Sequence, residues 1–230
     1  CSMADMANLA KVERSYRELS KVLNFDEKIT PVTYINSAAD LKAFCGEHGG
    51  IVCTSTNAPK ILDWSFKQRE KVLFFPDQNL GRWSGHKMGI PLAQMPIWDP
   101  DQPQGGFTVD EIKNAKILLW KGHCAVHQMF RLQNIEHFRK LHPNGQVISH
   151  PEAPFEVCLN SDFVGSTEYI LKTVTDAAPN TKWLVGTELN LVTRLAEQMK
   201  PQGKHVQFMS HVVCECSTMA RIDPQHLAWT

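Results

Sequence analysis

The chain has 230 residues and a hydrophobic content of 43%, which is enough for a substantial core in one large domain or two smaller ones. Its 24 basic and 24 acidic residues cancel, so no basic excess indicates a nucleic acid or an acidic membrane surface as a partner. The apolar runs are all shorter than the roughly 18 residues of a membrane-spanning helix, and no signal peptide is visible.

In chain order, residues 2–24 are expected to form a closing helix, and short apolar segments bounded by turn residues follow. Strands are predicted at Val32–Ile35, Gly50–Cys53, Val72–Phe75 and Ile117–Trp120. Helices or loops are predicted between them at Ser37–Cys45, Asn57–Gln68 and Gly81–Met88. The segment Trp83–Phe107 is rich in proline and glycine and is interpreted as an insertion or long loop.

The second half of the chain repeats this rhythm. Strands are predicted at Val147–Ser149, Phe163–Gly165, Trp183–Gly186 and Val206–Met209. Helices are predicted at His127–Leu141, Glu168–Ala178 and Leu189–Met199. Strands that alternate with helices indicate βαβ units and parallel sheets, so we predict an α/β fold.

The polar residues that follow the strands also repeat. Thr54-Ser55 corresponds to Ser166-Thr167, and Cys124 corresponds to Cys216. We therefore expect residues 25–124 and 125–230 to be two equivalent α/β units, the repeat itself ending near residue 216. Cys1 stands where the terminal cysteine of a preceding unit would stand, so residues 1–24 are interpreted as the end of a truncated first unit. Ligands are expected beyond the carboxyl ends of the strands.

Seven cysteines, an odd number, in a chain of this length argue against a disulfide framework. We expect reduced thiols, as in the cytoplasm, some buried and some binding a metal. Only Cys214 and Cys216 are closely spaced, and this spacing alone is a weak zinc signal.

The ordered set of polar segments strongly resembles the quinolinate synthase family across nearly the whole chain. The matching segments are Cys1-Ser2-Met3-Ala4, Tyr34-Ile35-Asn36-Ser37, Cys53-Thr54-Ser55-Thr56-Asn57-Ala58, Phe75-Pro76-Asp77-Gln78-Asn79-Leu80-Gly81, Trp120-Lys121-Gly122-His123-Cys124-Ala125-Val126-His127, His150-Pro151-Glu152, Val164-Gly165-Ser166-Thr167, Gly186-Thr187-Glu188 and Cys216-Ser217-Thr218-Met219. The resemblance implies three-layer α-β-α units with short parallel sheets around a pseudo-threefold axis, the first unit being largely missing. The chain then corresponds to the C-terminal two-thirds of the family.

The resemblance also implies a reaction. Iminoaspartate and dihydroxyacetone phosphate would condense to quinolinate, with loss of phosphate and water, for NAD biosynthesis. The implied cofactor is a [4Fe–4S] cluster held by Cys1, Cys124 and Cys216, with one iron open as a Lewis acid. An L-aspartate oxidase or an aspartate dehydrogenase is the implied supplier of the imino acid.

Two residue groups are expected to bind the substrates. Tyr34 and Asn36 share a strand face by the period of two, and the resemblance adds Ile35. Ser55, Ser166 and Thr167 lie at strand-to-helix turns, where hydroxyl and N–H groups bind anions. Helix N-capping is the alternative role of these hydroxyls.

Three acid–base candidates, Glu152, His150 and His127, lie in the second half of the chain. Tyr34, in the first half, could also transfer a proton. Glu152 is the best general-base candidate, with His150 beside it and Pro151 between them. His127 lies three residues after Cys124, so a helix that begins there would put both on one side. A turn or a surface histidine is the alternative interpretation of these residues.

Three other functions stay open at this point. The chain could be a catalytically incomplete fragment of the family, or another [4Fe–4S] hydro-lyase. It could also be a zinc or structural module that uses Cys214, Cys216 and a histidine such as His211. A product assay and elemental analysis separate these cases.

Overall fold

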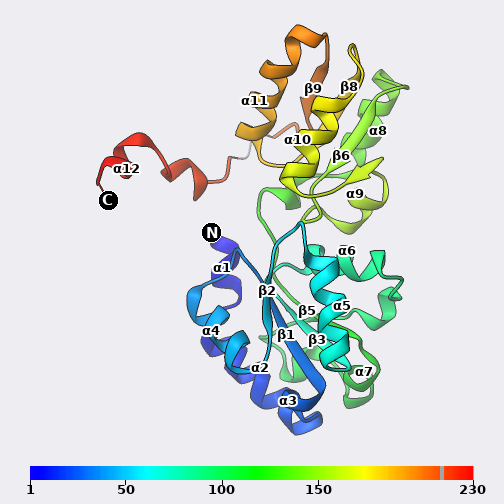
Figure 1. The fold of residues 1–230 in the computed structure, drawn as a ribbon. Helices are drawn as coiled ribbons and strands as arrows, with labels where there is room; N and C mark the ends of the chain where they lie inside the picture. Colours follow the sequence, from blue (N-terminus) through cyan, green and yellow to red (C-terminus); the bar gives the residue numbers. More distant parts are fainter. Residues whose placement is uncertain (213–214, 230) are drawn as a thin grey trace. The chain divides into compact units, whose positions relative to one another are not determined.

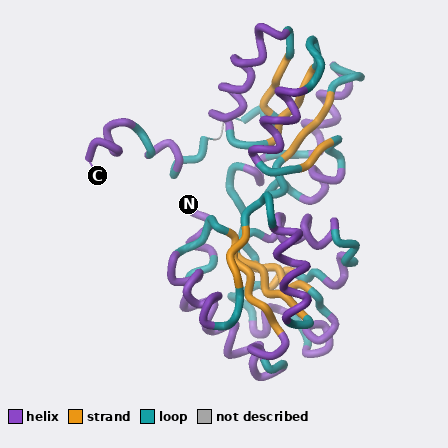
Figure 2. The backbone as a smooth tube through the Cα atoms, in the orientation of Figure 1, coloured by secondary structure: helices purple, strands orange, loops and turns teal. Residues whose placement is uncertain are grey.

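The computed structural model describes residues 1–212 and 215–229. The chain divides into two compact units, Cys1–His123 and Cys124–Thr230. Each unit has its own all-parallel sheet with helices packed on it, as the ribbon and tube views show (Figure 1 and Figure 2). The predicted α/β class with parallel sheets is therefore confirmed. None of the helices in the described part of the chain is both long and apolar enough to cross a bilayer.

The first unit contains a five-stranded sheet in the order β2-β1-β3-β5-β4. Its strands are β1 (Ile29–Tyr34), β2 (Ile51–Cys53), β3 (Lys71–Phe75), β4 (Ile97–Trp98) and β5 (Ile117–Trp120). Its helices are α1 (Ser2–Met6), α2 (Leu9–Val22), α3 (Phe25–Lys28), α4 (Ala39–Glu47), α5 (Ala58–Gln68), α6 (Gln78–Lys87) and α7 (Val109–Asn114), with 3-10 turns η1 (Leu92–Gln94) and η2 (Pro103–Gly106).

Helices cover both faces of this sheet, as is usual for parallel sheets. Successive side chains of a strand point to opposite faces, so neighbouring residues pack against different helices. Leu73 and Phe75 of β3 belong to the same buried cluster as Val12 and Leu19 of α2. Phe74, between them, faces α6, and Figure 1 shows α2 and α4 on one side of the sheet and α5 and α6 on the other. Burial is continuous along β1, β3 and β5, and it accounts for the wholly apolar sequence of β5. Thr30 and Thr33 of β1 and Lys71 of β3 are the buried polar residues of these strands.

The second unit contains a four-stranded sheet in the order β7-β6-β8-β9. Its strands are β6 (Gln146–Ser149), β7 (Phe163–Val164), β8 (Lys182–Gly186) and β9 (His205–Phe208). Its helices are α8 (Leu132–Leu141), α9 (Phe155–Leu159), α10 (Thr167–Asp176), α11 (Leu189–Met199) and α12 (Pro224–Trp229), with 3-10 turns η3 (His127–Met129), η4 (Lys200–Gln202) and η5 (Met219–Arg221).

The two sheets share one topology. Apart from β4, the strands of each unit lie in the spatial order second, first, third, fourth, and all pairs are parallel. This common order agrees with the repeat of polar residues along the sequence. Residues 1–24 pack within the first compact unit, where Ala7, Val12 and Leu19 join its core. Their assignment to the end of a preceding unit stays a prediction.

Four local predictions need correction. Residues 2–24 contain two helices, α1 and α2, and not one closing helix. The first strand begins at Ile29 and ends at Tyr34, so Ile35 lies outside it. The segment Trp83–Phe107 is more than an insertion loop, because its first residues complete α6 and its Ile97–Trp98 pair is edge strand β4 on β5. Two residues are too few to show a strand period.

The predicted helix His127–Leu141 is in fact two elements, η3 and α8. Phe130 and Arg131 between them have extended backbone angles. The Asn134 side chain accepts a hydrogen bond from Arg131 N at 2.9 Å and so caps a new helix start. Because of this interruption, the segment that carries Cys124 and His127 forms a separate turn and is not part of α8.

The contact of α6 with the sheet yields a stability prediction. A Cβ on Gly81 would lie 2.6 Å from Leu119 Cδ2 and 2.7 Å from Phe74 Cδ1, whereas a Cβ on Gly46 of α4 would meet no heavy atom within 4 Å. We expect Gly81→Ala to lower the free energy of unfolding by about 1–3 kcal/mol through overpacking. Gly46→Ala, the matched control, should leave it unchanged or raise it by up to about 1 kcal/mol. Urea unfolding followed by circular dichroism measures both, and equal destabilisation would contradict the packing.

Candidate metal and substrate site

The carboxyl end of β6 places two predicted site residues in a tight turn. His150 continues the strand pairing by one residue, since its N–H donates to Gly186 O of β8 at 2.8 Å. The N–H of Ala153 then donates to His150 O at 2.9 Å and closes the turn around Pro151 and Glu152. Glu152 is only 3% exposed. The sequence thus folds a potentially charged carboxylate into the interior of the second unit.

A second turn brings Cys124 and His127 to the same place. Gln128 N donates to Cys124 O at 3.0 Å, and η3 begins at His127. The thiol, imidazole and carboxylate atoms that Cys124, His127 and Glu152 offer to a metal all lie within 4.8 Å of one another. Two segments some 25 residues apart therefore contribute to one group, which we call the thiol–imidazole–carboxylate group.

His127 is the most constrained member of this group. Its Nδ1 lies 3.0 Å from Glu152 Oε2, and its ring stacks on His150 with centroids 4.9 Å apart and an interplanar angle of 27°. Neither ring nitrogen has a well-aligned hydrogen bond within the described residues, although both are buried. Buried polar atoms are normally satisfied, so an unsatisfied Nε2 indicates a position at which a ligand can bind.

His150 is a neutral imidazole at neutral pH. Burial lowers its pKa to about 4, and this effect exceeds the opposite effect of the Glu152 carboxylate. Glu152 N also approaches His150 Nδ1 at 3.4 Å, a long contact. Cys158 of α9 lies beneath this turn, with its Sγ 3.6 Å from Ala153 O and 3.7 Å from His150 O. No sequence pattern indicated this supporting role of Cys158.

The predicted substrate residues of the first unit differ in their exposure and in their place in the fold. Tyr34 is the buried last residue of β1, whereas Ile35 and Asn36 are exposed beyond the strand. The argument from strand alternation therefore does not reach Asn36. Ser55 is half-buried in the turn before α5, and Asn57, rather than Ser55, stands at the helix N-cap.

Capping explains two of the other polar residues. Ser166 is the buried N-cap of α10, and its hydroxyl accepts a hydrogen bond from Tyr169 N at 3.4 Å, while Thr167 is the first residue of the helix. Glu188 caps α11 by accepting from Leu191 N at 3.1 Å. The capping alternative is thus realised at Ser166, and a role there in anion binding stays a prediction.

Lys121, a cation of the first unit, has a partner within that unit. Lys121 Nζ lies 2.6 Å from Asp99 Oδ2, so this lysine serves an ion pair on the surface of the first unit.

The cysteines of the described residues fall into two sets. The three accessible cysteines are exposed or half-buried, namely Cys1, Cys124 and Cys216. The three buried cysteines are Cys45, Cys53 and Cys158. The accessible set coincides with the predicted cluster ligands.

The remaining metal candidates are placed as follows. Cys216 is not a member of the thiol–imidazole–carboxylate group. A cluster is larger than a single ion, so its thiolates need not lie as close together as the ligands of one ion. Cys214 lies outside the described residues, so the alternative zinc module of Cys214, Cys216 and His211 stays a prediction.

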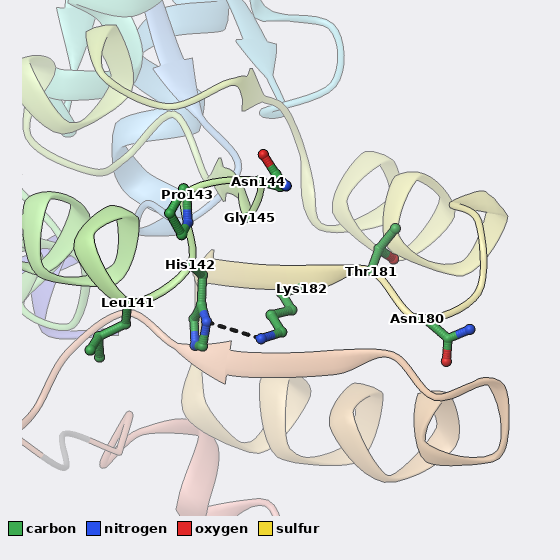
Figure 3. Close-up of a pocket in the computed structure, with 8 residues that line it drawn as sticks. All are labelled: Leu141, His142, Pro143, Asn144, Gly145, Asn180, Thr181 and Lys182. Carbon is green, nitrogen blue, oxygen red and sulfur yellow. Dashed lines mark hydrogen bonds between the residues drawn. The ribbon is translucent and has the colours of Figure 1, made fainter.

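A hollow of the second unit lies elsewhere. It has a volume of about 370 Å³ and is lined by the residues at the amino ends of β6 and β8, as Figure 3 shows. Lys182 Nζ lies 3.2 Å from His142 Nδ1 inside it. Because His150 and Glu152 follow the carboxyl end of β6, this hollow belongs to the opposite end of the sheet.

Comparison with known proteins gives a consistent result. A family model described as quinolinate synthetase A protein matches residues 1–230. The chain is 52% identical over 231 residues to a quinolinate synthase of Rhodopirellula baltica, and covers 58% of that relative. It is 50% identical to a quinolinate synthase of Corynebacterium glutamicum and 46% identical to one of Halalkalibacterium halodurans, covering 57% and 61% of them. In each case the whole chain is matched, so it spans about three-fifths of these relatives' length.

The two cysteine sets predict different reactivity. Burial raises the pKa of the Cys53 thiol to about 12 and also raises the pKa of Cys45. At pH 8 a thiol with a pKa near 12 has a thiolate fraction about a thousandfold lower than an ordinary cysteine. We expect iodoacetamide to modify the three accessible cysteines of the metal-free protein long before the three buried ones, as resolved by peptide mass spectrometry. Modification of Cys53 as fast as Cys124 would contradict the assigned burial.

Proposed function

The chain belongs to the quinolinate synthase family, and we propose that the protein condenses iminoaspartate with dihydroxyacetone phosphate to form quinolinate. Phosphate and water are lost, and the product enters NAD biosynthesis. The structural observation that carries this proposal is the grouping of Cys124, His127 and Glu152, with His150 stacked on His127. Because the chain spans about three-fifths of its relatives' length, the activity of the whole protein is proposed from this part.

The proposed cofactor is a [4Fe–4S] cluster with Cys1, Cys124 and Cys216 as its ligands. The family supports this choice, and so does the division of the cysteines, because the three candidates are the accessible members of the described set. When bound through three thiolates, such a cluster supplies one iron that can act as a Lewis acid toward a substrate oxygen or nitrogen. Among the described cysteines, Cys45 and Cys53 are buried and held protonated, so neither would supply a fourth thiolate.

Glu152 is the proposed general base. Its Oε2 would take a proton from the substrate, and His127 Nδ1, 3.0 Å away, would stabilise or pass on that proton. The neutral His150 ring would donate a hydrogen bond without adding positive charge. The stacking of the two rings keeps His127 in one orientation toward Glu152.

Substrate binding is proposed for the polar ends of both units. Ser166 and Thr167 open the ten-residue helix α10, whose first N–H groups favour carboxylate or phosphate. Ser55 lies in the turn before α5, two residues ahead of the N-cap Asn57. Pro151 shapes the wall around Glu152, and Tyr34, Ile35 and Asn36 complete the proposed substrate contacts. Tyr34 would also exchange a proton with the substrate.

The wider context follows from the same family. We place the two units in a pseudo-threefold arrangement of three-layer units, which their common strand order supports. An L-aspartate oxidase or aspartate dehydrogenase would supply iminoaspartate, and the cytoplasm would keep the thiols reduced.

The test uses full-length protein reconstituted with iron and sulfide without oxygen. We expect visible iron–sulfur absorption and quinolinate formation, measured by chromatography. Glu152→Gln should keep the absorption and reduce turnover at least about a hundredfold, because a general base contributes that much or more. Cys124→Ser should lose the absorption. Glu156→Gln, an exposed residue of α9, is the matched control and should behave like the wild type.

The outcomes separate the components of the proposal. A protein with a full cluster that consumes these substrates without forming quinolinate would refute the activity. A different dehydrated product would favour another [4Fe–4S] hydro-lyase. Wild-type turnover in Glu152→Gln would remove Glu152 from the mechanism.

A further inference from the structure

The thiol–imidazole–carboxylate group has the composition of a site for one metal ion. Cys124, His127 and Glu152 offer sulfur, nitrogen and oxygen ligands, and all three come from the second unit. We propose that these residues bind a single divalent transition-metal ion, with zinc preferred, independently of Cys1 and Cys216. This site is distinct from the three-cysteine cluster and shares only Cys124 with it.

The geometry requires little movement to bind an ion. Zinc bonds of about 2.0–2.3 Å in a tetrahedral site place neighbouring ligand atoms about 3.5 Å apart. The three ligand atoms already lie within 4.8 Å of one another, and His127 Nδ1 is 3.0 Å from Glu152 Oε2. Small side-chain rotations of Cys124 and Glu152 would close the remaining difference. The backbone that carries them is held by hydrogen bonds at Gln128 N and Ala153 N.

Burial and charge favour a dication at this position. Glu152 is 3% exposed and His127 is 7% exposed, so water solvates their polar atoms poorly. A divalent ion would balance one thiolate and one carboxylate, and the filled site would carry no net charge. It would also give the unsatisfied imidazole a ligand bond, whichever ring nitrogen binds.

The ligands select the kind of ion. Magnesium and calcium prefer sites made of oxygen ligands, which disfavours them beside a thiolate and an imidazole. Zinc binds cysteine, histidine and glutamate, and it binds such sites more tightly than ferrous iron does. Three protein ligands leave a fourth position for water or a substrate atom. Because Cys124 cannot serve both centres, zinc at this site would block assembly of the proposed cluster.

Cobalt(II) is a spectroscopic probe for this site. Full-length protein, reduced and freed of metal without oxygen, is titrated with Co²⁺. We expect a thiolate-to-cobalt charge-transfer band and the visible bands of four-coordinate cobalt, both of which one equivalent of Zn²⁺ removes. Cys124→Ser should abolish the charge-transfer band. His127→Asn and Glu152→Gln should each lower the Co²⁺ affinity at least tenfold.

Matched variants separate this site from the cluster cysteines. Cys1→Ser and Cys216→Ser should leave the cobalt spectrum and affinity unchanged, and so should Cys158→Ser, a thiol buried under the same turn. Thermal unfolding by circular dichroism verifies that each variant is folded. If His127→Asn does not fold, Glu152→Gln and the cysteine variants decide the question by themselves.

Two results would overturn the inference. One is cobalt binding without a thiolate band. The other is loss of binding in Cys1→Ser or Cys216→Ser with normal binding in the His127 and Glu152 variants, which would place the ion on the cysteines. Quinolinate formation is not measured in this titration, so the proposed function and the mononuclear site can fail separately.

Discussion

A carboxylate inside a protein must be compensated by an opposite charge or by hydrogen bonds, because burial removes it from water. Glu152 is subject to this constraint, since it is 3% exposed at the end of β6. His127 lies 3.0 Å away, and His127 in turn is stacked on the neutral His150. A buried carboxylate beside an imidazole can be compensated by binding a cation or a proton. Both the proposed base catalysis and the proposed zinc site use this property.

The parallel sheet is what produces that centre. The pairing of β6 with β8 ends at the hydrogen bond that His150 N donates to Gly186 O. The turn that carries Glu152 begins at this point. The break between η3 and α8 lets Cys124 and His127 form their own turn. The site thus depends on backbone hydrogen bonds at the strand end more than on the propensities of the residues that it contains.

The sequence was sufficient to predict the strand–helix alternation, because buried parallel strands appear as short apolar runs such as Ile117–Trp120. It was not sufficient for β4, which has two residues, or for the end of β1, since Ile35 continues the apolar pattern while lying exposed. Among the site residues, the His150-Pro151-Glu152 motif and the spacing of Cys124 and His127 were visible in the sequence. Their mutual approach depends on tertiary pairing, which a local pattern does not contain.

The central claim is that the group around Glu152 is a cation centre with Cys124 as a ligand. The most direct measurement is anomalous X-ray diffraction, at the iron and zinc absorption edges, from crystals of full-length protein loaded with each metal. The account predicts an anomalous peak at bonding distance from Cys124 Sγ with either metal, and zinc also bonded to His127 and Glu152. A Cys124 Sγ without a metal after both loadings, beside an unchanged His127–Glu152 contact, would contradict it.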